Sequence, residues 1–208
     1  MTQAPFLQSA QTWNRRFATP EFLFGTAPNA YLAKQLYRLP PCGKALSIAD
    51  GEGRNSVWLA RQGLQVDAFD FAEAGVAKAQ ALSEQQGVKV CFTDCDVDDW
   101  PWRASAYDVV AAIFIQFADP VLRARLFARM IDTLKPGGTL ILQGYTRRQL
   151  EFDTGGPGRL DHLYTADMVR SAFDGMDLKE LIEYEEVLAE GSQHVGQSAL
   201  LGMAAVRR

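Results

Sequence analysis

Apolar and polar positions follow two alternating periods along the chain, and these periods predict strands separated by helices. Short apolar runs bounded by turn residues predict strands, whereas apolar residues at every third or fourth position predict helices. Several predicted helices end at glycine, and one begins at Asp119-Pro120 and closes on Lys-Pro-Gly-Gly. The predicted strands are residues 44–49, 64–71, 88–97, 107–117, 139–145, 177–191 and 197–208, and the predicted helices are residues 55–63, 72–87, 119–138 and 165–173.

Strands that alternate with helices form a parallel sheet with right-handed crossovers. The run "YDVVAAIFIQF" is continuously apolar, which is typical of a strand buried on both faces. A short connection joins the last two strands, so they are expected to form an antiparallel hairpin. The predicted fold class is therefore α/β, a Rossmann-like doubly wound sheet of seven mostly parallel strands with an antiparallel C-terminal hairpin.

Two segments lie outside this alternation. Residues 1–40 contain no predicted strand and carry the aromatic residues Trp13, Phe17, Phe22, Phe24 and Tyr31, so we expect helices packed beside or over the C-terminal edge of the sheet. Residues 146–163 form a polar loop rich in glycine, and loops of this length usually have a function. We expect one domain over residues 1–208.

Composition narrows the class of protein. The chain has 208 residues, 48% of them hydrophobic, and a net charge of -4, which argues against a nucleic-acid partner. No basic leader with an apolar core begins the sequence, and no apolar run is long enough to span a bilayer. Cys42, Cys91 and Cys95 are scattered, which favours a reducing compartment over a disulfide framework or a zinc site. We therefore expect a cytoplasmic monomer or homodimer with no metal and no membrane partner.

The loop "DGEGRNS" after the first strand is the main candidate for a ligand site. Glycine turns that open a helix bind ligands through backbone N–H groups and the helix dipole. The dinucleotide fingerprint needs a third glycine, but Ser56 and Val57 stand there, and the loop has no lysine for a phosphate. Asp50 and Glu52 would repel a pyrophosphate. The loop thus suits a ligand with a cationic or zwitterionic group, and a plain tight turn is the alternative.

Two further acids follow the next strands. Asp70 ends the second strand about twenty residues after the loop, where an acid can accept hydrogen bonds from both ribose hydroxyls. Asp96 and Val97 follow the third strand, where a carboxylate and the next backbone N–H can bind an adenine edge. The alternatives are a charge at a helix N-terminus for Asp70 and a solvated acidic loop for Asp96. The loops after strands one to three are expected to line one crevice.

The stretches "ALSIADGEGRNSVWLARQG" and "VDAFDFAEAGVAKAQ" resemble the class I S-adenosylmethionine-dependent methyltransferases. Together with "WNRRFATPEFLFGTAPNAYL" and "GYTRRQLEFDTGGP", the form "GEGRNS" is similar to a bacterial branch named after tellurite-resistance methyltransferases and related to thiopurine methyltransferase. The resemblance implies S-adenosylmethionine as cofactor. It also implies an N-terminal lid at 1–40, a cofactor-binding core at 41–145, and a substrate loop, helix and hairpin at 146–208.

The resemblance also assigns cofactor contacts. Asp70 would bind the ribose, Phe71 would flank the adenine, and Asn55 would brace the loop. Many members carry an acid and a glycine where this chain has Ser47 and Ala49, and Asp50 offers an acid from a neighbouring position. The implied cofactor contacts are Ala49, Asp50, Gly51, Gly53, Asn55, Asp70, Phe71, Asp96, Val97, Phe114 and Gln116.

Methyl transfer is an in-line displacement, and a base is needed only when the nucleophile arrives protonated. The chain has two histidines, of which His194 lies between the hairpin strands and can bend toward the site. Tyr145, at the end of the fifth strand, is the second catalytic candidate. A solvated turn histidine and a packed aromatic residue are the alternatives. The candidate substrate contacts are Trp13, Arg16, Phe24, Tyr31, Phe117 and Arg147.

The expected acceptor is a small molecule, with a thiol or a chalcogen oxyanion favoured by the resemblance. Arginine side chains would suit an oxyanion. No Asn-Pro-Pro-Tyr follows the fourth strand, which argues against amino methylation of nucleic acid. Two other functions are considered: a non-catalytic module that binds S-adenosylmethionine, and an NAD(P)-dependent oxidoreductase. The missing third glycine and the terminal hairpin argue against the oxidoreductase.

Overall fold

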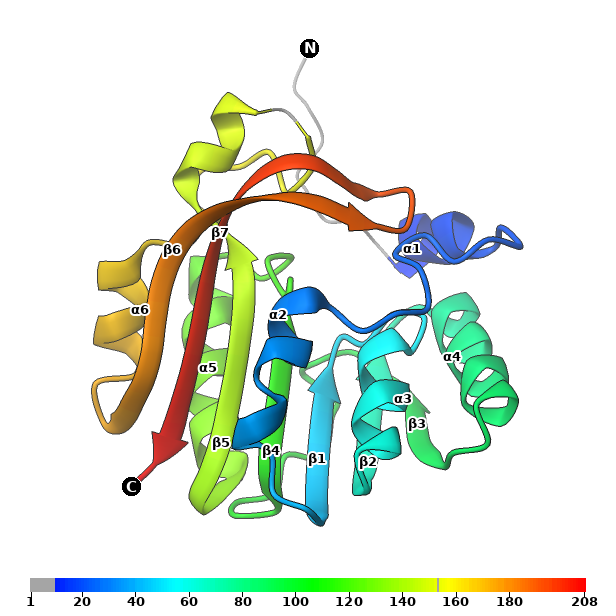
Figure 1. The fold of residues 1–208 in the computed structure, drawn as a ribbon, viewed down its shortest axis with the longest axis horizontal. Helices are drawn as coiled ribbons and strands as arrows, with labels where there is room; N and C mark the ends of the chain where they lie inside the picture. Colours follow the sequence, from blue (N-terminus) through cyan, green and yellow to red (C-terminus); the bar gives the residue numbers. More distant parts are fainter. Residues whose placement is uncertain (1–9, 153) are drawn as a thin grey trace.

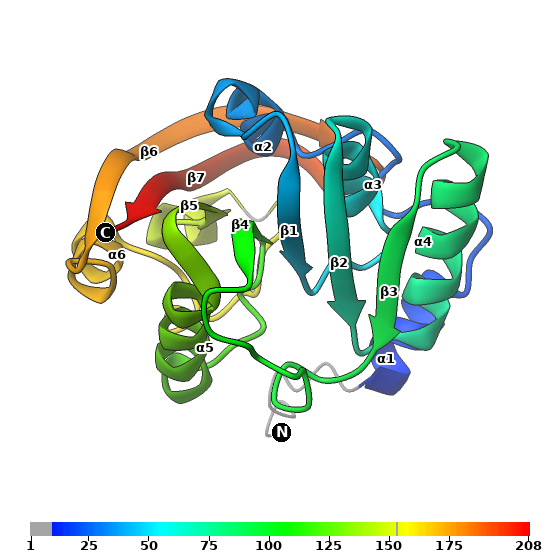
Figure 2. The same ribbon diagram turned by 90° about the horizontal axis from the view of Figure 1, so that it is seen from below.

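The computed structural model describes residues 10–152 and 154–208, which form a single seven-stranded sheet with helices on both faces (Figures 1 and 2). Its elements in chain order are α1 (Ala10–Phe17), α2 (Ala30–Lys34), η1 (Leu36–Arg38), β1 (Gly43–Ile48), α3 (Arg54–Arg61), β2 (Leu64–Asp70), α4 (Glu73–Gln85), β3 (Val90–Asp94), β4 (Tyr107–Ile113), α5 (Pro120–Thr133), β5 (Leu134–Tyr145), η2 (Arg147–Glu151), α6 (Ala166–Ala172), β6 (Met176–Glu190) and β7 (His194–Arg207).

The strand order confirms the predicted fold class. The sheet runs β3-β2-β1-β4-β5-β7-β6, with β1 to β5 parallel and β7 antiparallel to both of its neighbours. The chain first builds outward from β1 to β3 and then returns to place β4 on the other side of β1. This reversal leaves a crevice at the carboxyl ends of β1 and β4, where ligands bind in sheets of this type.

The apolar run of β4 is explained by burial on both faces. Val109 and Ala111 pack with residues of α2 and α3, whereas Val110 and Ala112 pack with residues of α5 and α6. Figure 2 shows the two helical layers on opposite sides of the strands. Because helices cover both faces of β4, the strand carries apolar residues on both faces. It can therefore be recognised as a central strand from the sequence alone.

The β6–β7 hairpin extends past the carboxyl edge of the sheet and curves toward the N-terminal segment (Figure 1). The turn of the hairpin meets residues 23–25: the Leu23 carbonyl accepts hydrogen bonds from Ser192 N at 2.8 Å and Gln193 N at 3.1 Å. Gly191 has φ 65°, and a Cβ there would lie 2.2 Å from the Leu23 oxygen. Only glycine permits this approach.

Two expected boundaries change in the structure. The helix predicted for residues 119–138 ends at Thr133, and β5 already begins at Leu134. Pro136 disfavours helical backbone at the residue before it and removes a helical donor, so the chain turns extended earlier than the Lys-Pro-Gly-Gly signal indicated. Residues 146–163, expected to be a loop, include the short helix η2.

The N-terminal segment contains α1, α2 and η1 and no strand among its described residues, as expected; residues 1–9 lie outside the described part. The helix α1 packs on α4, next to the β3 side of the sheet. None of the helices in residues 10–152 and 154–208 has the length and apolar character needed to cross a membrane.

We predict that the fold requires glycine at position 53. Gly53 has φ 89°, and a Cβ there would lie 2.6 Å from Ala79 Cβ and 2.7 Å from Ala79 Cα, which belongs to α4. Gly53→Ala should therefore cost left-handed strain and overpacking, each of about 1–3 kcal/mol. Gly87→Ala is the matched control, because Gly87 has φ 66° and nothing within 4 Å of the added Cβ. Denaturant unfolding should show a larger loss for Gly53→Ala; equal losses would refute the packing argument.

Candidate functional site

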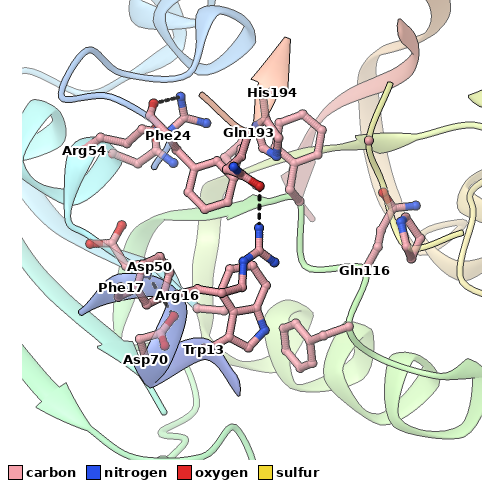
Figure 3. A pocket seen from close by; sticks show the side chains of 18 of the residues that line it. Trp13, Arg16, Phe17, Phe24, Asp50, Arg54, Asp70, Gln116, Gln193 and His194 are labelled. Carbon is pink, nitrogen blue, oxygen red and sulfur yellow. Dashed lines mark hydrogen bonds between the residues drawn. The ribbon is translucent and has the colours of Figure 1, made fainter. Parts of the chain in front are cut away.

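A pocket lies at the carboxyl ends of β1 and β4, where the chain reverses the order of the strands. Its volume of about 290 Å³ is near the lower end for small-molecule sites. Residues from the β1 and β4 loops form its floor, and α1, residue 24 and the hairpin turn form its cover (Figure 3). The pocket is lined by Trp13, Arg16, Phe17, Phe24, Ala49, Asp50, Gly51, Arg54, Asn55, Asp70, Phe71, Ile113, Phe114, Gln116, Phe117, Tyr145, Gly155, Gly156, Pro157, Gln193 and His194.

Two lining residues adopt backbone conformations that favour glycine. Ala49 has φ 48° and Phe114 has φ 56°, and each is the first residue after a central parallel strand. Such strain is found preferentially at functional sites. The left-handed backbone at Ala49 accounts for the glycine that the family pattern places there, since glycine adopts this conformation without strain.

Asp50 braces its own loop. Its Oδ1 accepts a hydrogen bond of 2.6 Å from Ser47 Oγ, its Oδ2 accepts one from Ser56 Oγ, and the Ser56 N–H also donates to Oδ1 at 3.3 Å. Burial raises the pKa of Asp50, and the serine hydrogen bonds oppose that rise. Ser47, where the resemblance would place an acid, thus donates a hydrogen bond to Asp50.

Asp70 connects the glycine-rich loop after β1 to the turn that follows β2. Its Oδ2 accepts a hydrogen bond from Gly51 N and its Oδ1 accepts one from Ala72 N, both at 2.9 Å. Burial raises the pKa of Asp70 to about 6, with Asp50 and Asp94 adding to the rise and the two backbone donors opposing it. Each carboxylate oxygen can accept more than one hydrogen bond, so both oxygens retain capacity for a ligand.

Glu52 holds the N-terminal segment over the site. Its Oε2 accepts hydrogen bonds from Leu23 N at 2.8 Å and from Phe24 N at 3.4 Å. Its other oxygen pairs with Lys78 of α4, and the Glu52 side chain is only 2% exposed. Glu52, predicted to repel a pyrophosphate, therefore lies outside the pocket lining and fixes residues 23 and 24.

Arg54 and Glu190 link the first loop to the hairpin. Arg54 Nη2 lies 2.7 Å from Glu190 Oε2, and Arg54 Nη1 donates to the Phe24 carbonyl at 3.1 Å. Glu190 also accepts hydrogen bonds from Asn29 Nδ2 at 3.1 Å and Ala30 N at 2.9 Å. Three segments far apart in the sequence therefore meet at one buried carboxylate.

Asn55 makes the corresponding link on the helical side. Its Oδ1 accepts a hydrogen bond of 2.9 Å from the backbone N–H of Asn29. The Asn29 side chain in turn accepts from Leu32 N and so caps α2. Asn55 therefore ties the first loop to the N-terminal segment while it lines the pocket.

Aromatic side chains form the cover of the pocket. Trp13 and Phe17 stack with ring centroids 5.1 Å apart, and Phe24 lies 6.2 Å from Trp13. The Arg16 guanidinium lies 4.1 Å from the Trp13 ring centroid and donates to Gln193 Oε1 at 3.0 Å, across the pocket mouth (Figure 3). α1 thus contacts the hairpin turn directly.

His194 sits between two aromatic rings. Its ring centroid is 4.5 Å from that of Phe24 and 4.3 Å from that of Phe114. Its Nδ1 lies 3.6 Å from Glu190 Oε2, across the hairpin turn. Burial lowers the pKa of His194, while Glu190 opposes this shift. The imidazole is therefore neutral near pH 7.

Tyr145 and Gln116 differ in how their polar atoms are used. The Tyr145 hydroxyl is buried and has no hydrogen-bond partner among the described residues, and burial raises its pKa, so it stays protonated. The Gln116 amide is engaged with backbone: Nε2 donates to the Tyr145 and His162 carbonyls, and Oε1 accepts from Tyr145 N. Gln116 positions Tyr145, whose hydroxyl can still bind a ligand.

Most of the predicted site residues are brought together in this pocket. Of the predicted cofactor contacts, the ones that line the pocket are Ala49, Asp50, Gly51, Asn55, Asp70, Phe71, Phe114 and Gln116. Of the predicted substrate and catalytic residues, those that line it are Trp13, Arg16, Phe24, Phe117, Tyr145 and His194.

Two predicted substrate contacts, Tyr31 and Arg147, lie outside the pocket lining. Tyr31 is buried against β7, where a Cβ on Gly202 would come within 2.3 Å of its ring, and its hydroxyl donates to Glu180 Oε1 at 2.8 Å. It covers the α2 side of the sheet and does not line the pocket. Arg147 begins η2 with an exposed side chain and also lies outside the lining.

Three predicted cofactor contacts lie outside the pocket lining. Gly53 is buried against α4, so its small size serves helix packing. Asp96 is exposed, and its Oδ1 accepts a hydrogen bond from Asp98 N at 3.0 Å. Val97 packs in the main core, and its carbonyl accepts from Trp102 Nε1 and Arg129 Nη1. The local geometry of Asp96 is that of the solvated acidic loop considered as its alternative.

Several lining residues were not predicted. Arg54 lies inside the predicted loop, but the sequence alone assigns it no role, because its partner Glu190 lies far away along the chain. Phe17 lies one helical turn after Trp13, a spacing that could have indicated a shared face. Gln193 precedes His194 at the hairpin turn. The described residues contain no group of three or more His, Cys, Asp or Glu side chains arranged to hold a metal ion.

Comparisons with known proteins agree with this arrangement. Residues 45–138 match the family described as "Methyltransferase domain". A curated relative, the ubiquinone biosynthesis O-methyltransferase of Xanthomonas axonopodis pv. citri, is 34% identical over 119 residues, which cover 55% of this chain and 48% of the relative. The chain thus spans about half the length of that relative.

Two solved structures share the fold. TehB from Haemophilus influenzae has a TM-score of 0.72 and 16% sequence identity, over 96% of this chain and 67% of its own. Phosphoethanolamine N-methyltransferase 2 of Haemonchus contortus, in complex with S-adenosyl-L-methionine, has a TM-score of 0.70 and 19% identity, over 97% of this chain and 59% of its own. Residues 45–138 thus resemble a methyltransferase domain, and the two solved structures share the fold of the chain.

Proposed function

We propose that the protein transfers a methyl group from S-adenosylmethionine to a hydroxyl or thiol of a small, largely apolar molecule. The observation that carries this proposal is the His194 imidazole, which is buried between aromatic rings in the same pocket as Asp70. A buried neutral imidazole suits an acceptor that arrives protonated.

The residues at the β1 and β2 ends fit the cofactor. A Cβ on Gly51 would come within 3.3 Å of the Phe17 ring, so glycine keeps space open beside the loop. Asp70 offers two acceptor oxygens for the ribose hydroxyl pair, and Phe71 offers an aromatic face beside it. The acids of the loop suit a cofactor that carries a sulfonium and an amino group, which agrees with the absence of a lysine from this loop.

When bound, S-adenosylmethionine supplies an electrophilic methyl group on a sulfonium sulfur. The chain's own residues bind and orient both molecules. Asp70 holds the ribose end, while the left-handed residues Ala49 and Phe114 place their backbone along the floor of the pocket. Orientation of this kind accounts for a large part of the rate enhancement in a displacement reaction.

His194 acts on the acceptor. Its Nδ1 faces Glu190, so the other ring nitrogen, Nε2, is the one available to take the proton of the hydroxyl or thiol. The Tyr145 hydroxyl, which has no partner among the described residues, can donate a hydrogen bond to the acceptor. Trp13, Phe17 and Phe24 exclude water from the reacting groups, which strengthens each polar interaction inside.

The pocket and the comparisons together bear on the class of methyl acceptor. A hydroxyl agrees with the name of the curated relative, an O-methyltransferase, and the thiol carries forward the prediction made from the sequence. The chalcogen oxyanion is the second candidate: the likeness to TehB and the Arg16 guanidinium at the pocket mouth favour it. An oxyanion needs no base, so dependence of the rate on His194 distinguishes the two. Location in the cytoplasm, a monomeric or homodimeric state and the absence of a nucleic-acid partner remain predictions from composition.

Calorimetric titration with S-adenosylmethionine, its demethylated product, NADH and ATP tests the proposal first. Selective binding of the first two, followed by transfer of a labelled methyl group to a phenol or thiol, would support it. Binding without transfer to any hydroxyl, thiol or oxyanion would favour the non-catalytic module. Binding of NADH alone would overturn the proposal in favour of the oxidoreductase.

Cofactor affinity should depend on the ionisation of Asp70. Its pKa of about 6 means that the carboxylate is protonated as the pH falls below that value, and a protonated carboxyl accepts the ribose hydroxyls less well. Calorimetry with the demethylated product should show affinity about tenfold weaker at pH 5 than at pH 8. Asp70→Asn should weaken binding by about tenfold to a hundredfold at pH 8 and remove the pH dependence. Asp67→Asn, on the same strand but outside the pocket lining, is the control, and an unchanged pH profile in Asp70→Asn would refute the assignment.

Turnover should depend on His194 when the acceptor is protonated. His194→Gln should lower kcat by about 10²–10⁴-fold and leave the affinity for the demethylated product unchanged, because the base is lost while the cofactor contacts remain. Val195→Ala is the neighbouring control, since Val195 is exposed and outside the pocket lining. A kcat equal to that of the unmodified protein would exclude His194 as the base.

A further inference from the structure

The hairpin turn brings an acid and a base together in a fixed register. Glu190 and His194 are the last pair of the β6–β7 ladder and are joined by residues 191–193. Cross-strand partners project from the same face of a hairpin, so their side chains are neighbours. Nδ1 of His194 is buried and lies 3.6 Å from Glu190 Oε2, with no closer polar partner among the described residues.

The Glu190 carboxylate is held in place by three donors other than His194. Arg54 Nη2, Asn29 Nδ2 and the Ala30 N–H all contact it within 3.1 Å. Burial alone would raise the pKa of Glu190, but the His194 and Arg54 contacts and the Ala30 donor outweigh it and hold the pKa at about 2. The carboxylate is therefore ionised near neutral pH.

The surroundings of His194 contain few other charges. Arg54 from α3 and Arg16 from α1 both lower the pKa of His194, after the larger effect of burial, and Glu190 from β6 opposes them. The Tyr145 hydroxyl from β5 is neutral, and Phe24 and Phe114 cover the two faces of the imidazole. Glu190 is thus the acid that faces the ring.

We propose that Glu190 is a positioning residue, which holds His194 as the neutral Nδ1–H tautomer and so leaves Nε2 unprotonated as the base. An Nδ1–H group donates toward a carboxylate, whereas an unprotonated Nδ1 would place a lone pair against a fixed negative charge. As the acceptor's proton moves to Nε2, the ring becomes cationic, and Glu190 stabilises that charge. This inference rests on the proposed function for the role of Nε2, but the tautomer itself does not.

The tautomer can be measured in the unmodified protein. The chain has two histidines, so ¹⁵N-labelled imidazole spectra contain two sets of ring signals, and His194→Gln assigns them by removing one. At pH 8 we expect the His194 signals of an Nδ1–H ring with Nε2 unprotonated. Signals of the Nε2–H tautomer would overturn the proposal, whether or not any Glu190 variant folds.

Glu190→Gln tests the effect of the charge. This variant keeps the shape of the side chain, so the pKa of His194 measured by the same spectra should fall by about one unit, because the imidazolium loses its anionic neighbour. Glu186→Gln is the matched control: Glu186 lies on the same strand and pairs with Lys34 at the surface, and its replacement should leave the His194 signals in place. An unchanged His194 pKa in a folded Glu190→Gln protein would contradict the proposal.

Turnover separates this inference from the proposed function. With a protonated acceptor, the lower pH limit of kcat/KM should shift in Glu190→Gln by the same amount as the His194 pKa, and Glu190→Asp should restore part of it. A protein that shows the expected tautomer and pKa shift but no methyl transfer refutes the proposed function and leaves the role of Glu190 on the His194 ring intact. Methyl transfer with the Nε2–H tautomer refutes only the role of Glu190.

Discussion

The cover of the pocket depends on the ion pair between Arg54 and Glu190. This pair joins the loop after β1 to the end of β6, and the same two side chains also hold Phe24 O, Asn29 and Ala30. Replacing one partner of a buried pair leaves a charge without compensation, which costs about 3–5 kcal/mol. Because this arrangement satisfies both charges, the pair favours the observed placement of the N-terminal segment and the hairpin over the site.

Backbone strain and buried charge are concentrated at the same edge of the sheet. Ala49 and Phe114 have left-handed backbone on the two strands that flank the reversal, and the surrounding hydrogen bonds hold them there: Asp50 N donates to Phe69 O, and Phe114 N donates to Gln143 O. Hydrogen bonds to neighbouring strands thus fix the floor of the pocket before any ligand binds. A site fixed in this way loses little conformational freedom on binding, which favours affinity.

The sequence predicted the sheet well because the signals there are local. β4 is apolar on both faces, and the glycine turn after β1 and the acid ending β2 are recognisable without knowledge of the rest of the chain. The cover of the pocket was harder, because its contacts join residues up to 177 positions apart, as between Arg16 and Gln193. Trp13 and Tyr31 carry similar sequence signals. One lines the pocket and the other packs on Gly202, because α1 packs on α4 whereas α2 packs on the sheet.

The balance of charge at the site explains why a cationic ligand suits it. Among the described residues, Glu52 and Glu190 form ion pairs, with Lys78 and Arg54, whereas Asp50 and Asp70 form none and rely on hydroxyl and backbone donors. Burial penalises both unpaired carboxylates and raises the pKa of each. A positively charged group placed nearby would offset that penalty and favour the ionised forms of both carboxylates. Part of the binding free energy of such a group would therefore come from reducing the desolvation cost of Asp50 and Asp70. An anionic dinucleotide would add to the same cost. The preference for a sulfonium cofactor over a pyrophosphate therefore follows from the unpaired acids as much as from the glycines of the loop.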